Sequence, residues 1–372
     1  MAVGTGKKVV LAMSGGVDSS AAAALLLEDG YEVVGCFMRL GSESPEPEAC
    51  DTSGSRKQGC CSVNDAADAR HVAAILGIPF YVLNFKDDFG RIIDHFVREY
   101  HAGRTPNPCV RCNDWLKFGK LHDYARSIDA DFVASGHYAR IDRSSGGARL
   151  RRGLDRRKDQ SYVLFGADEH RRAQMLLPIG GLQKDETRRI AEQAGLPVFN
   201  KPDSQEICFV PDNDYARLVT QRSEPGEVAS GRIVDTEGKD LGEHPGHQHF
   251  TIGQRRGLNL ALGYPIYVVD KRPESNTVTV GGREHLLASG AVADQITWHE
   301  SMRPSGFERC DVKIRYNSSA VPARVCFRAE DEIEVRFAEP VEAVTPGQAV
   351  VCYREDLVLG GGWIREALPV SA

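Results

Sequence analysis

The stretch that most constrains the fold of this chain is residues 10–20, which read VLAMSGGVDSS. An apolar strand runs directly into a glycine–serine loop, and a helix opens at Asp18. Gly15 and Gly16 lack a Cβ, so their backbone can adopt positive φ and approach an anion closely, while N–H groups and the helix dipole point toward it. This order of elements predicts a phosphate-binding loop at the carboxyl end of a strand.

The residues of the loop narrow its chemistry. The Gly-Lys-Ser/Thr ending of a Walker loop is missing, which disfavours transfer of a γ-phosphate. Ser14, Ser19 and Ser20 add hydroxyl donors instead. The run SGGVDSS resembles the pyrophosphate loop of adenylating enzymes, which split ATP into AMP and pyrophosphate and use AMP to activate a carbonyl oxygen. A plain glycine–serine turn between a strand and a helix is the alternative interpretation.

The first half of the chain alternates strands with helices. The patterns predict strands over 8–13, 32–38, 79–84 and 131–135, and helices over 18–28, 64–76 and 87–100, followed by one that Asn113 caps. This order implies an α/β domain with a doubly wound parallel sheet, and nucleotides bind at the carboxyl ends of such strands. Met38 and Gly136 follow two of these strands and could hold adenine and ribose, although Met38 also suits a core position.

Beyond residue 222 the pattern changes to short segments with a period of two, separated by Gly, Pro and Asp turns. Strands are predicted over 231–235, 250–252, 266–270 and 277–281, and then over 311–315, 323–327, 333–337 and 349–353. We therefore expect an N-terminal α/β domain over 1–215, a small mostly β central domain over 216–290 and a C-terminal β-barrel over 291–372.

Composition limits the setting in which the chain works. Its 372 residues exceed one comfortable core, and 41% hydrophobic with 26% charged residues is usual for globular proteins. The absence of a long apolar run and of a signal-peptide pattern predicts a cytoplasmic protein with no membrane partner. In that compartment ten cysteines would be mostly reduced, so a Cys-x-x-Cys pattern points to redox chemistry or metal.

The charge distribution bears on nucleic-acid binding. A formal net charge of -6 argues against such a partner, but the position of the basic residues matters more than the total. The run ARLRRGLDRRK over 148–158 supplies the local positive field that a polyanion needs. A solvated hairpin tip is the alternative interpretation of this run.

Cys109 and Cys112 lie in the segment GRTPNPCVRCN. Pro106 and Pro108 stiffen this loop, and Asn113 is expected to begin the next helix. A helix N-terminus favours the thiolate of a neighbouring cysteine, so Cys112 is a candidate nucleophile.

Other cysteines and histidines are weaker candidates. Cys208, in KPDSQEICFV, would by itself be interpreted as an inert buried thiol. Cys60 and Cys61 are vicinal, and such neighbours rarely bind one tetrahedral metal ion together. The run HPGHQH has ligand-like spacing but is also typical of a loop, and a closed zinc site would need a second Cys-x-x-Cys. The histidines of this run are His244, His247 and His249.

Across nearly its whole length the chain resembles the bacterial tRNA-specific 2-thiouridylases, which install sulfur at carbon 2 of the wobble uridine. The matching segments, in order, are SGGVDSS, GCCSVNDAADAR, GRTPNPCVRCN, SGHYAR, RRGLDRRKDQSY, DSQEICF, FTIGQRRGL, KIRYN, TPGQAVV and LGGGWI.

The resemblance implies roles for individual residues. The ATP site would comprise Ala12, Met13, Ser14, Gly15, Gly16, Val17, Asp18, Ser19, Met38 and Gly136. Cys112 would be the attacking nucleophile, and Cys208 would carry the sulfur as a persulfide. Asn107, Pro108 and Cys109 would lie near the target base. Contacts to tRNA would come from His137, Lys158, Asp159, Gln160, Arg315, Tyr316 and Gln348.

The chemistry agrees with these roles. The C2 oxygen of uridine is a poor leaving group until adenylation converts it to AMP, which requires ATP with Mg²⁺. A persulfide is a nucleophile near neutral pH, and a second thiol can release its sulfur by forming a disulfide. The base must also leave the anticodon stack. The expected partners are tRNAs with a wobble uridine, namely the Glu, Gln and Lys acceptors, and a sulfur-relay protein or cysteine desulfurase.

One departure from the family leaves two chemistries open. Some members carry Asp in place of Cys109, as a general acid or base, and that role does not transfer to a thiol without a suitable pKa. Cys109, Cys112 and Cys208 could instead ligate a [4Fe-4S] cluster. Two other functional classes are a pyrophosphate-loop synthetase or amidotransferase acting on a small metabolite, and a catalytically dead RNA-binding module.

Overall fold

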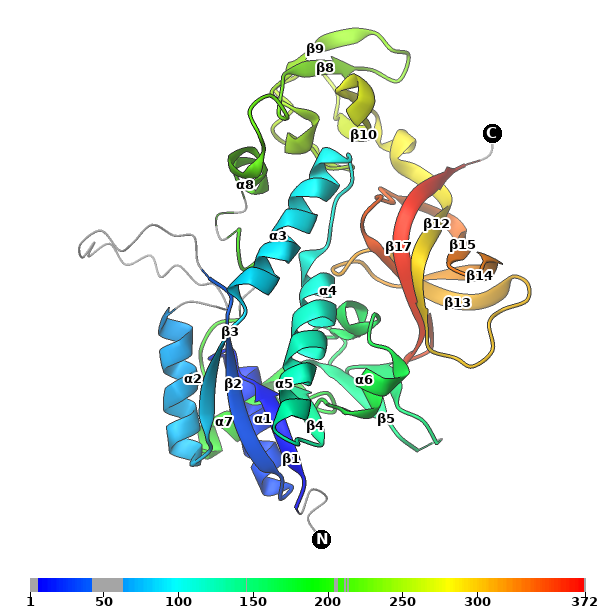
Figure 1. The fold of residues 1–372 in the computed structure, drawn as a ribbon. Coiled ribbons are helices and arrows are strands. Elements are labelled where there is room, and N and C mark those ends of the chain that lie inside the picture. Colours follow the sequence, from blue (N-terminus) through cyan, green and yellow to red (C-terminus); the bar gives the residue numbers. More distant parts are fainter. Residues whose placement is uncertain are drawn as a thin grey trace, which may run out of the picture. The chain divides into compact units, whose positions relative to one another are not determined.

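The structure is a computed structural model that describes residues 6–41, 63–144, 146–203, 207–210, 212 and 214–370. The chain forms two compact units (Figure 1). Unit 1 comprises Met1–Ile92 and Cys109–Asn213, and unit 2 comprises Ile93–Pro108 and Asp214–Ala372. In the described part of the chain, no helix is long and apolar enough to cross a membrane.

A parallel sheet forms the centre of unit 1. Its strand order is β3 (Phe80–Asn84), β2 (Glu32–Arg39), β1 (Lys8–Ala12), β4 (Phe132–Ser135) and β7 (Met175–Leu176). Successive side chains of a strand point to opposite faces, and Val9, Val10 and Leu11 of β1 are all fully buried. Both faces are therefore covered, which explains the continuous apolar sequence of this strand.

Helices cover the sheet of unit 1. On one side α1 (Val17–Glu28) packs with α2 (Val63–Leu76) and α7 (Lys184–Gln193), and Ala21, Ala22 and Ala23 of α1 are fully buried. Small side chains let this helix approach the sheet closely. The remaining helices are α3 (Lys86–His101), which spans the boundary between the units, α4 (Pro108–Cys112), the π-helix η1 (Asn113–Lys120), α5 (Leu121–Ser127), η2 (Ser161–Leu164) and α6 (Glu169–Ala173).

A short antiparallel hairpin completes unit 1. It pairs β5 (Ala139–Asp142) with β6 (Arg149–Arg152), and it carries the first part of the basic run.

In unit 2, helix α8 (Tyr215–Arg222) precedes a small sheet with the order β10 (Tyr267–Arg272), β11 (Thr277–Gly281), β8 (Gly231–Val234) and β9 (Asp240–His244). Short 3₁₀ turns η3 (His247–His249), η4 (Pro273–Ser275) and η5 (Arg283–Leu286) connect its elements. The strand predicted over 250–252 is wrong, because this segment continues irregularly after η3 even though Phe250 is buried in the core of the sheet. The sequence DLGEH of β9 lacks apolar alternation, which is why the pattern missed it.

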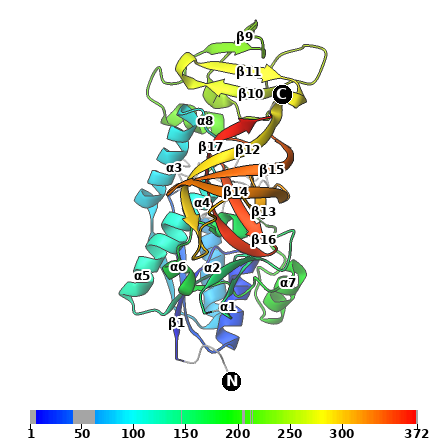
Figure 2. The same cartoon turned by 90° about the vertical axis from the view of Figure 1, so that its right-hand side faces the viewer.

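The C-terminal strands of unit 2 form a closed barrel (Figure 2). The order is β12 (Leu287–Trp298), β15 (Glu332–Glu342), β14 (Val321–Ala329), β13 (Glu308–Lys313), β16 (Ala349–Arg354) and β17 (Leu357–Pro369), and β17 pairs back onto β12. A Cβ on Gly360 would lie 2.4 Å from the Thr297 carbonyl oxygen, and one on Gly362 would lie 2.6 Å from that of Asp294. The glycines of LGGGW therefore permit the close approach that closes the barrel.

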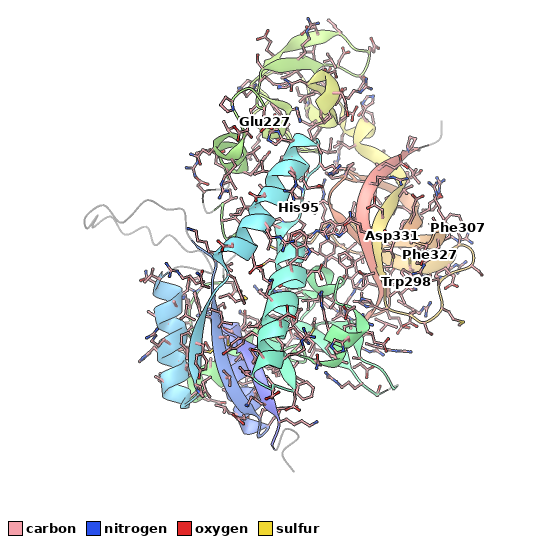
Figure 3. All side chains as sticks on the ribbon, viewed as in Figure 1. His95, Glu227, Trp298, Phe307, Phe327 and Asp331 are labelled. Carbon is pink, nitrogen blue, oxygen red and sulfur yellow. The ribbon has the colours of Figure 1, made fainter. Side chains whose placement is uncertain are left out.

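Aromatic side chains cover part of the barrel (Figure 3). Trp298 and Phe327 pack edge to face with ring centroids 5.3 Å apart, and the Asp331 carboxylate accepts the Ile296 N–H at 2.6 Å.

The predicted fold class is confirmed: a parallel α/β domain, a mostly β middle section and a C-terminal barrel.

Candidate functional site

The glycine–serine loop joins β1 to α1 as predicted. Gly15 has a φ of +71°, and a Cβ there would lie 2.2 Å from the Asp65 carbonyl oxygen, so only glycine fits. Gly16 is the N-cap of α1. The Ser14 and Ser19 hydroxyl oxygens lie 3.3 Å apart beside this helix start. The loop thus presents hydroxyl groups and a helix N-terminus together, which suits a phosphate.

Neighbouring strand ends make room for the loop. A Cβ on Gly136, just after β4, would lie 2.6 Å from the Ser19 backbone nitrogen. Ala12 and Met13 are buried, so they can meet a nucleotide only through their backbone, whereas Met38 at the end of β2 is half-buried. The Ser20 hydroxyl donates to the Gly16 carbonyl at 2.8 Å, which makes it an internal contact of the helix.

A lysine approaches the loop from α7. The Lys184 Nζ lies 2.7 Å from one Asp18 carboxylate oxygen and 2.9 Å from the other, and it also contacts Asp203 at 2.8 Å. The Tyr138 hydroxyl donates to the same Asp18 carboxylate at 2.9 Å. Asp203 in turn accepts from Lys158 Nζ at 2.7 Å. Burial alone would raise the pKa of Asp203, but the hydrogen bonds from Lys158 and Lys184 outweigh it and lower this pKa.

A second lysine contacts the loop from the segment that carries Cys208. The Lys201 Nζ donates to the Gly15 carbonyl at 3.0 Å, to Asp65 at 2.7 Å and to Asp68 at 2.6 Å. Burial lowers the pKa of Lys201, but the two carboxylates outweigh that effect and raise it. The ammonium of Lys201 is therefore held against the loop.

Sequence reasoning missed these groups. Lys184, Lys201 and Asp203 lie more than a hundred residues after the loop, and none belongs to a recognised phosphate motif. Lys201 and Asp203 lie in KPDSQEIC, where the cysteine is the residue that draws attention, and Lys184 lies in KDETRR, which carries no recognised signal.

The helix that follows the Cys-x-x-Cys segment begins earlier than predicted. It starts at Pro108 and continues without a break through η1 and α5, so the expectation that Asn113 begins it is wrong. Pro108 occupies a first-turn position, where a missing N–H costs nothing. Cys109 is consequently the exposed thiol of the first turn, and Cys112 lies one turn further along and is half-buried. The helix dipole favours the thiolate of Cys109 more than that of Cys112.

Cys208 is half-buried in the same unit. Among the residues that the structure describes, no group of three or more His, Cys, Asp or Glu side chains is placed to hold a metal ion. Cys109, Cys112 and Cys208 thus do not form a gathered ligand set for a [4Fe-4S] cluster in this arrangement. Cys60 and Cys61 lie outside the described residues.

The histidines of HPGHQH have other partners. His244 Nδ1 accepts the Gly246 N–H at 3.0 Å, and the His247 ring contacts the Asn276 side chain at 3.1 Å. His249 Nε2 lies 3.4 Å from the Thr220 hydroxyl. These contacts match the loop interpretation of this run.

Several residues expected to meet tRNA have internal hydrogen bonds in unit 1. The buried Asp159 carboxylate accepts the Gly153 and Ser161 N–H groups at 3.0 and 3.1 Å. The Gln160 side chain accepts the Tyr138 N–H at 3.0 Å. His137 is buried and lies 2.7 Å from the Ser135 hydroxyl, and burial lowers its pKa well below the usual range. These side chains shape the segment that presents Lys158.

The remaining tRNA candidates lie in unit 2. The Gln348 amide donates to the Thr105 carbonyl at 3.0 Å, and so fixes the backbone that leads to Asn107 and Pro108. The Arg315 guanidinium donates to the Ala343 carbonyl at 2.5 Å and to the Thr345 hydroxyl at 2.7 Å. Tyr316 is half-buried, with the Lys313 ammonium 5.8 Å from its ring centroid.

The basic run divides into a paired and an exposed part. Arg151 forms an ion pair with Asp142 at 2.8 Å within the β5–β6 hairpin. Arg156 and Arg157 are exposed and, with Lys158 and Lys184, line a pocket of about 530 Å³. The exposed part is therefore the stronger candidate for phosphate contacts.

A parallel α/β sheet with a serine–glycine phosphate loop and acid and lysine groups at its strand ends defines a nucleotide-binding enzyme of the pyrophosphate-loop type. Family models agree: residues 7–212 match a "tRNA methyl transferase HUP domain", 223–282 a "tRNA methyl transferase PRC-barrel domain" and 289–364 an "Aminomethyltransferase beta-barrel domain".

Curated relatives identify the family more closely. The chain is 48% identical to the tRNA-specific 2-thiouridylase MnmA of Rhodopirellula baltica, over 97% of both chains. It is 50% identical to that of Geobacter metallireducens, over 97% of this chain and 98% of the relative. The chain belongs to the family of tRNA-specific 2-thiouridylases, which confirms the resemblance found in the sequence. Among solved structures, a 4-thiouridine synthetase in complex with RNA and ATP is similar at 16% identity with a TM-score of 0.37, over 59% of this chain and 51% of that one.

Proposed function

We propose that this chain catalyses ATP-dependent 2-thiolation of the wobble uridine of tRNA. ATP adenylates the C2 oxygen of the base, and sulfur from a cysteine persulfide then displaces AMP. The observation that best supports this proposal is a set of contacts between the loop that would bind ATP and the segment whose cysteine would carry the sulfur. The nucleotide loop and the segment that carries Cys208 share the ion pairs of Lys184 and Lys201.

The first step uses the loop. Backbone N–H groups at the start of α1 and the Ser14 and Ser19 hydroxyls bind phosphate oxygens of ATP. Asp18 is the carboxylate nearest to this position on α1, and it is the group that would hold the Mg²⁺ of the substrate. Lys184 then offers positive charge to the departing pyrophosphate, because charge at the leaving group lowers the barrier to adenylation.

The second step uses the cysteines. The terminal sulfur of the Cys208 persulfide attacks C2, so a C–S bond forms while the C2–O bond to AMP breaks. The Cys112 thiolate attacks the Cys208 sulfur, which breaks the persulfide bond and forms a Cys112–Cys208 disulfide. A thiol reductant reduces this disulfide, and a sulfur donor then reloads Cys208. In this scheme Cys109, exposed in the first helical turn, assists proton transfer near the base together with the Asn107–Pro108 backbone.

The proposal extends to partners and location. Substrates are the Glu, Gln and Lys acceptor tRNAs, a sulfur-relay protein or cysteine desulfurase supplies the sulfur, and the reaction takes place in the cytoplasm. We assign catalysis to residues 1–215 and tRNA contacts to the central section 216–290, with further tRNA contacts from Arg315, Tyr316 and Gln348 of the barrel over 291–372. The family resemblance supports each of these assignments.

An exchange assay tests the proposed function. Exchange of labelled pyrophosphate into ATP should depend on added tRNA, because the adenylated group belongs to the RNA. A synthetase acting on a small metabolite would exchange without tRNA, and an RNA-binding module without catalysis would not exchange under either condition.

A further inference from the structure

We infer that Lys201 and Asp203 form an ionic clamp, a positioning device that ties the segment carrying Cys208 to the nucleotide loop. Through this clamp, occupancy of the loop by ATP sets the position of Cys208. The inference rests on the proposed function and adds to it an order of events, since binding of ATP repositions the sulfur carrier before the sulfur is transferred.

Lys201 forms one side of the clamp. An ammonium group has three N–H donors, and Lys201 directs them at the Gly15 carbonyl, Asp65 and Asp68, all within 3.0 Å. Gly15 belongs to the loop, whereas Asp65 and Asp68 belong to α2. Lys201 therefore fixes the start of its own segment against both the loop and α2.

Asp203 forms the other side. Its carboxylate contacts Lys184 at 2.8 Å and Lys158 at 2.7 Å, and Arg188 approaches it at 3.3 Å. Lys184 simultaneously contacts Asp18 of the loop helix at 2.7 Å. One ammonium group is thus shared between a residue of the nucleotide site and a residue five positions before Cys208.

The shared lysine makes the clamp sensitive to the nucleotide. The side chains of Lys184, Asp18 and Asp203 are 11%, 31% and 22% exposed, so their charges are only partly screened by solvent. Phosphate oxygens entering the loop compete with Asp18 and Asp203 for this ammonium, and Mg²⁺ competes with the ammonium for the Asp18 carboxylate. A ligand with such differential contacts shifts the arrangement of the groups that it competes with.

Alkylation of Cys208 tests the clamp without requiring thiolation. The full chain is treated with iodoacetamide, with and without ATP and Mg²⁺, and the peptides that contain Cys208 and Cys326 are quantified by mass spectrometry. ATP should alter the Cys208 rate by about threefold or more in the parent and by less than about 1.5-fold in Lys201→Met and Asp203→Asn, as expected for loss of a coupled charge pair. Cys326, in the barrel, should be unaffected.

Kinetics provide a second readout. With tRNA and a sulfur donor, both variants should lose about tenfold in the kcat for thiolation, with more AMP formed for each thiolated base. The matched control is Arg189→Met on α7. Arg189 is exposed, and among the residues that the structure describes its ion-pair partner is Glu186, at 3.9 Å. If Lys201→Met does not fold, Asp68→Asn tests the same contact from a more exposed side chain.

An unchanged ATP effect on Cys208 alkylation in the variants would overturn the clamp, as would an equal loss of AMP formation and thiolation. Failure of the proposed function looks different. In that case the parent would show the ATP effect on Cys208, and the variants would lose it, while no thiolated tRNA formed with any protein.

Discussion

At the scale of single residues, the loop depends on two backbone positions that admit only glycine. A Cβ on Gly15 would lie 2.2 Å from the Asp65 carbonyl oxygen, and one on Gly136 would lie 2.6 Å from the Ser19 backbone nitrogen. The strand–loop–helix order of the sequence indicates the first of these glycines. Charged partners could not be read in this way, because Lys184 and Lys201 reach the loop only through the tertiary fold. Ion pairs between distant segments leave no periodic signal in a single sequence.

The first prediction concerns the carboxylate of Asp18. Asp18→Asn should lower tRNA-dependent ATP–pyrophosphate exchange by about a hundredfold, because it removes the carboxylate that faces Lys184 and the magnesium position. Affinity for tRNA, measured by filter binding, should change by less than about twofold, since the exposed arginines remain. Equal losses of exchange and tRNA binding would contradict this assignment.

Lys271 carries a prediction about pH. Burial lowers its pKa to about 7. Within the described part of the chain, its ammonium donates to the Phe250 carbonyl at 2.8 Å and lies 5.7 Å from the ring centroid of Tyr100. Because the folded pKa lies below the ordinary value, the cost of burying the charge is fully present below about pH 7 and disappears as pH rises toward 10.5.

Chemical denaturation of Lys271→Met should therefore show a variant that gains on the order of 1 kcal/mol or more over the parent at pH 6.5. That advantage should disappear by about pH 10, where the parent has a neutral amine and keeps its hydrogen bond. A pH-independent difference between the two proteins would contradict the lowered pKa.

Arg156 and Arg157 carry a prediction about RNA. The double variant Arg156→Glu with Arg157→Glu should raise the tRNA KM by about tenfold, and each lost phosphate contact should reduce the salt slope of binding by roughly 0.7 to 0.9. Arg189→Glu, equally basic and exposed but on α7, is the control. An unchanged salt slope would indicate that Arg156 and Arg157 are solvated surface residues that do not contact RNA.

At the scale of elements, the strands and helices of the parallel sheet follow from their apolar patterns, whereas helix starts depend on local chemistry. The sequence pattern predicts a loop at Pro108, whereas in the structure Pro108 lies in the first turn of a helix. Strand β9, which the sequence pattern does not predict, has a polar sequence and is a strand because it pairs with β8. Its neighbours, rather than its own residues, determine its conformation.

The early helix start bears on Cys109. We expect Cys109→Asp to keep substantial thiolation activity, because a carboxylate in the first helical turn interacts favourably with the dipole and can move a proton as a thiol does. A cluster mechanism predicts the opposite, since a carboxylate is a poor ligand for cluster iron. Single-turnover thiolation by anaerobically purified protein, below about a hundredth of the parent and without iron, would favour the cluster.

At the scale of the whole molecule, the order of a parallel α/β domain, a small β section and a closed barrel was predictable because each has a distinct period. The sequence predicts a C-terminal β-barrel, but it does not predict which contacts close the barrel. The glycines of LGGGW matter because of what lies opposite them on β12, which only the pairing reveals. The loop of the candidate site was predictable from the sequence, whereas the ion pairs that join it to the segment before Cys208 were not. The roles of the cysteines stay a prediction.

In the proposed reaction one chain activates the wobble uridine with ATP and then transfers sulfur from Cys208. A single-turnover reaction of Cys208→Ser with tRNA, ATP and a sulfur donor, in which AMP and 2-thiouridine are both quantified, tests this order most directly. We expect AMP formation within about threefold of the parent and a loss of 2-thiouridine of at least about a hundredfold, because the persulfide acts after adenylation. Parent-level 2-thiouridine from the serine variant would show that Cys208 does not carry the sulfur.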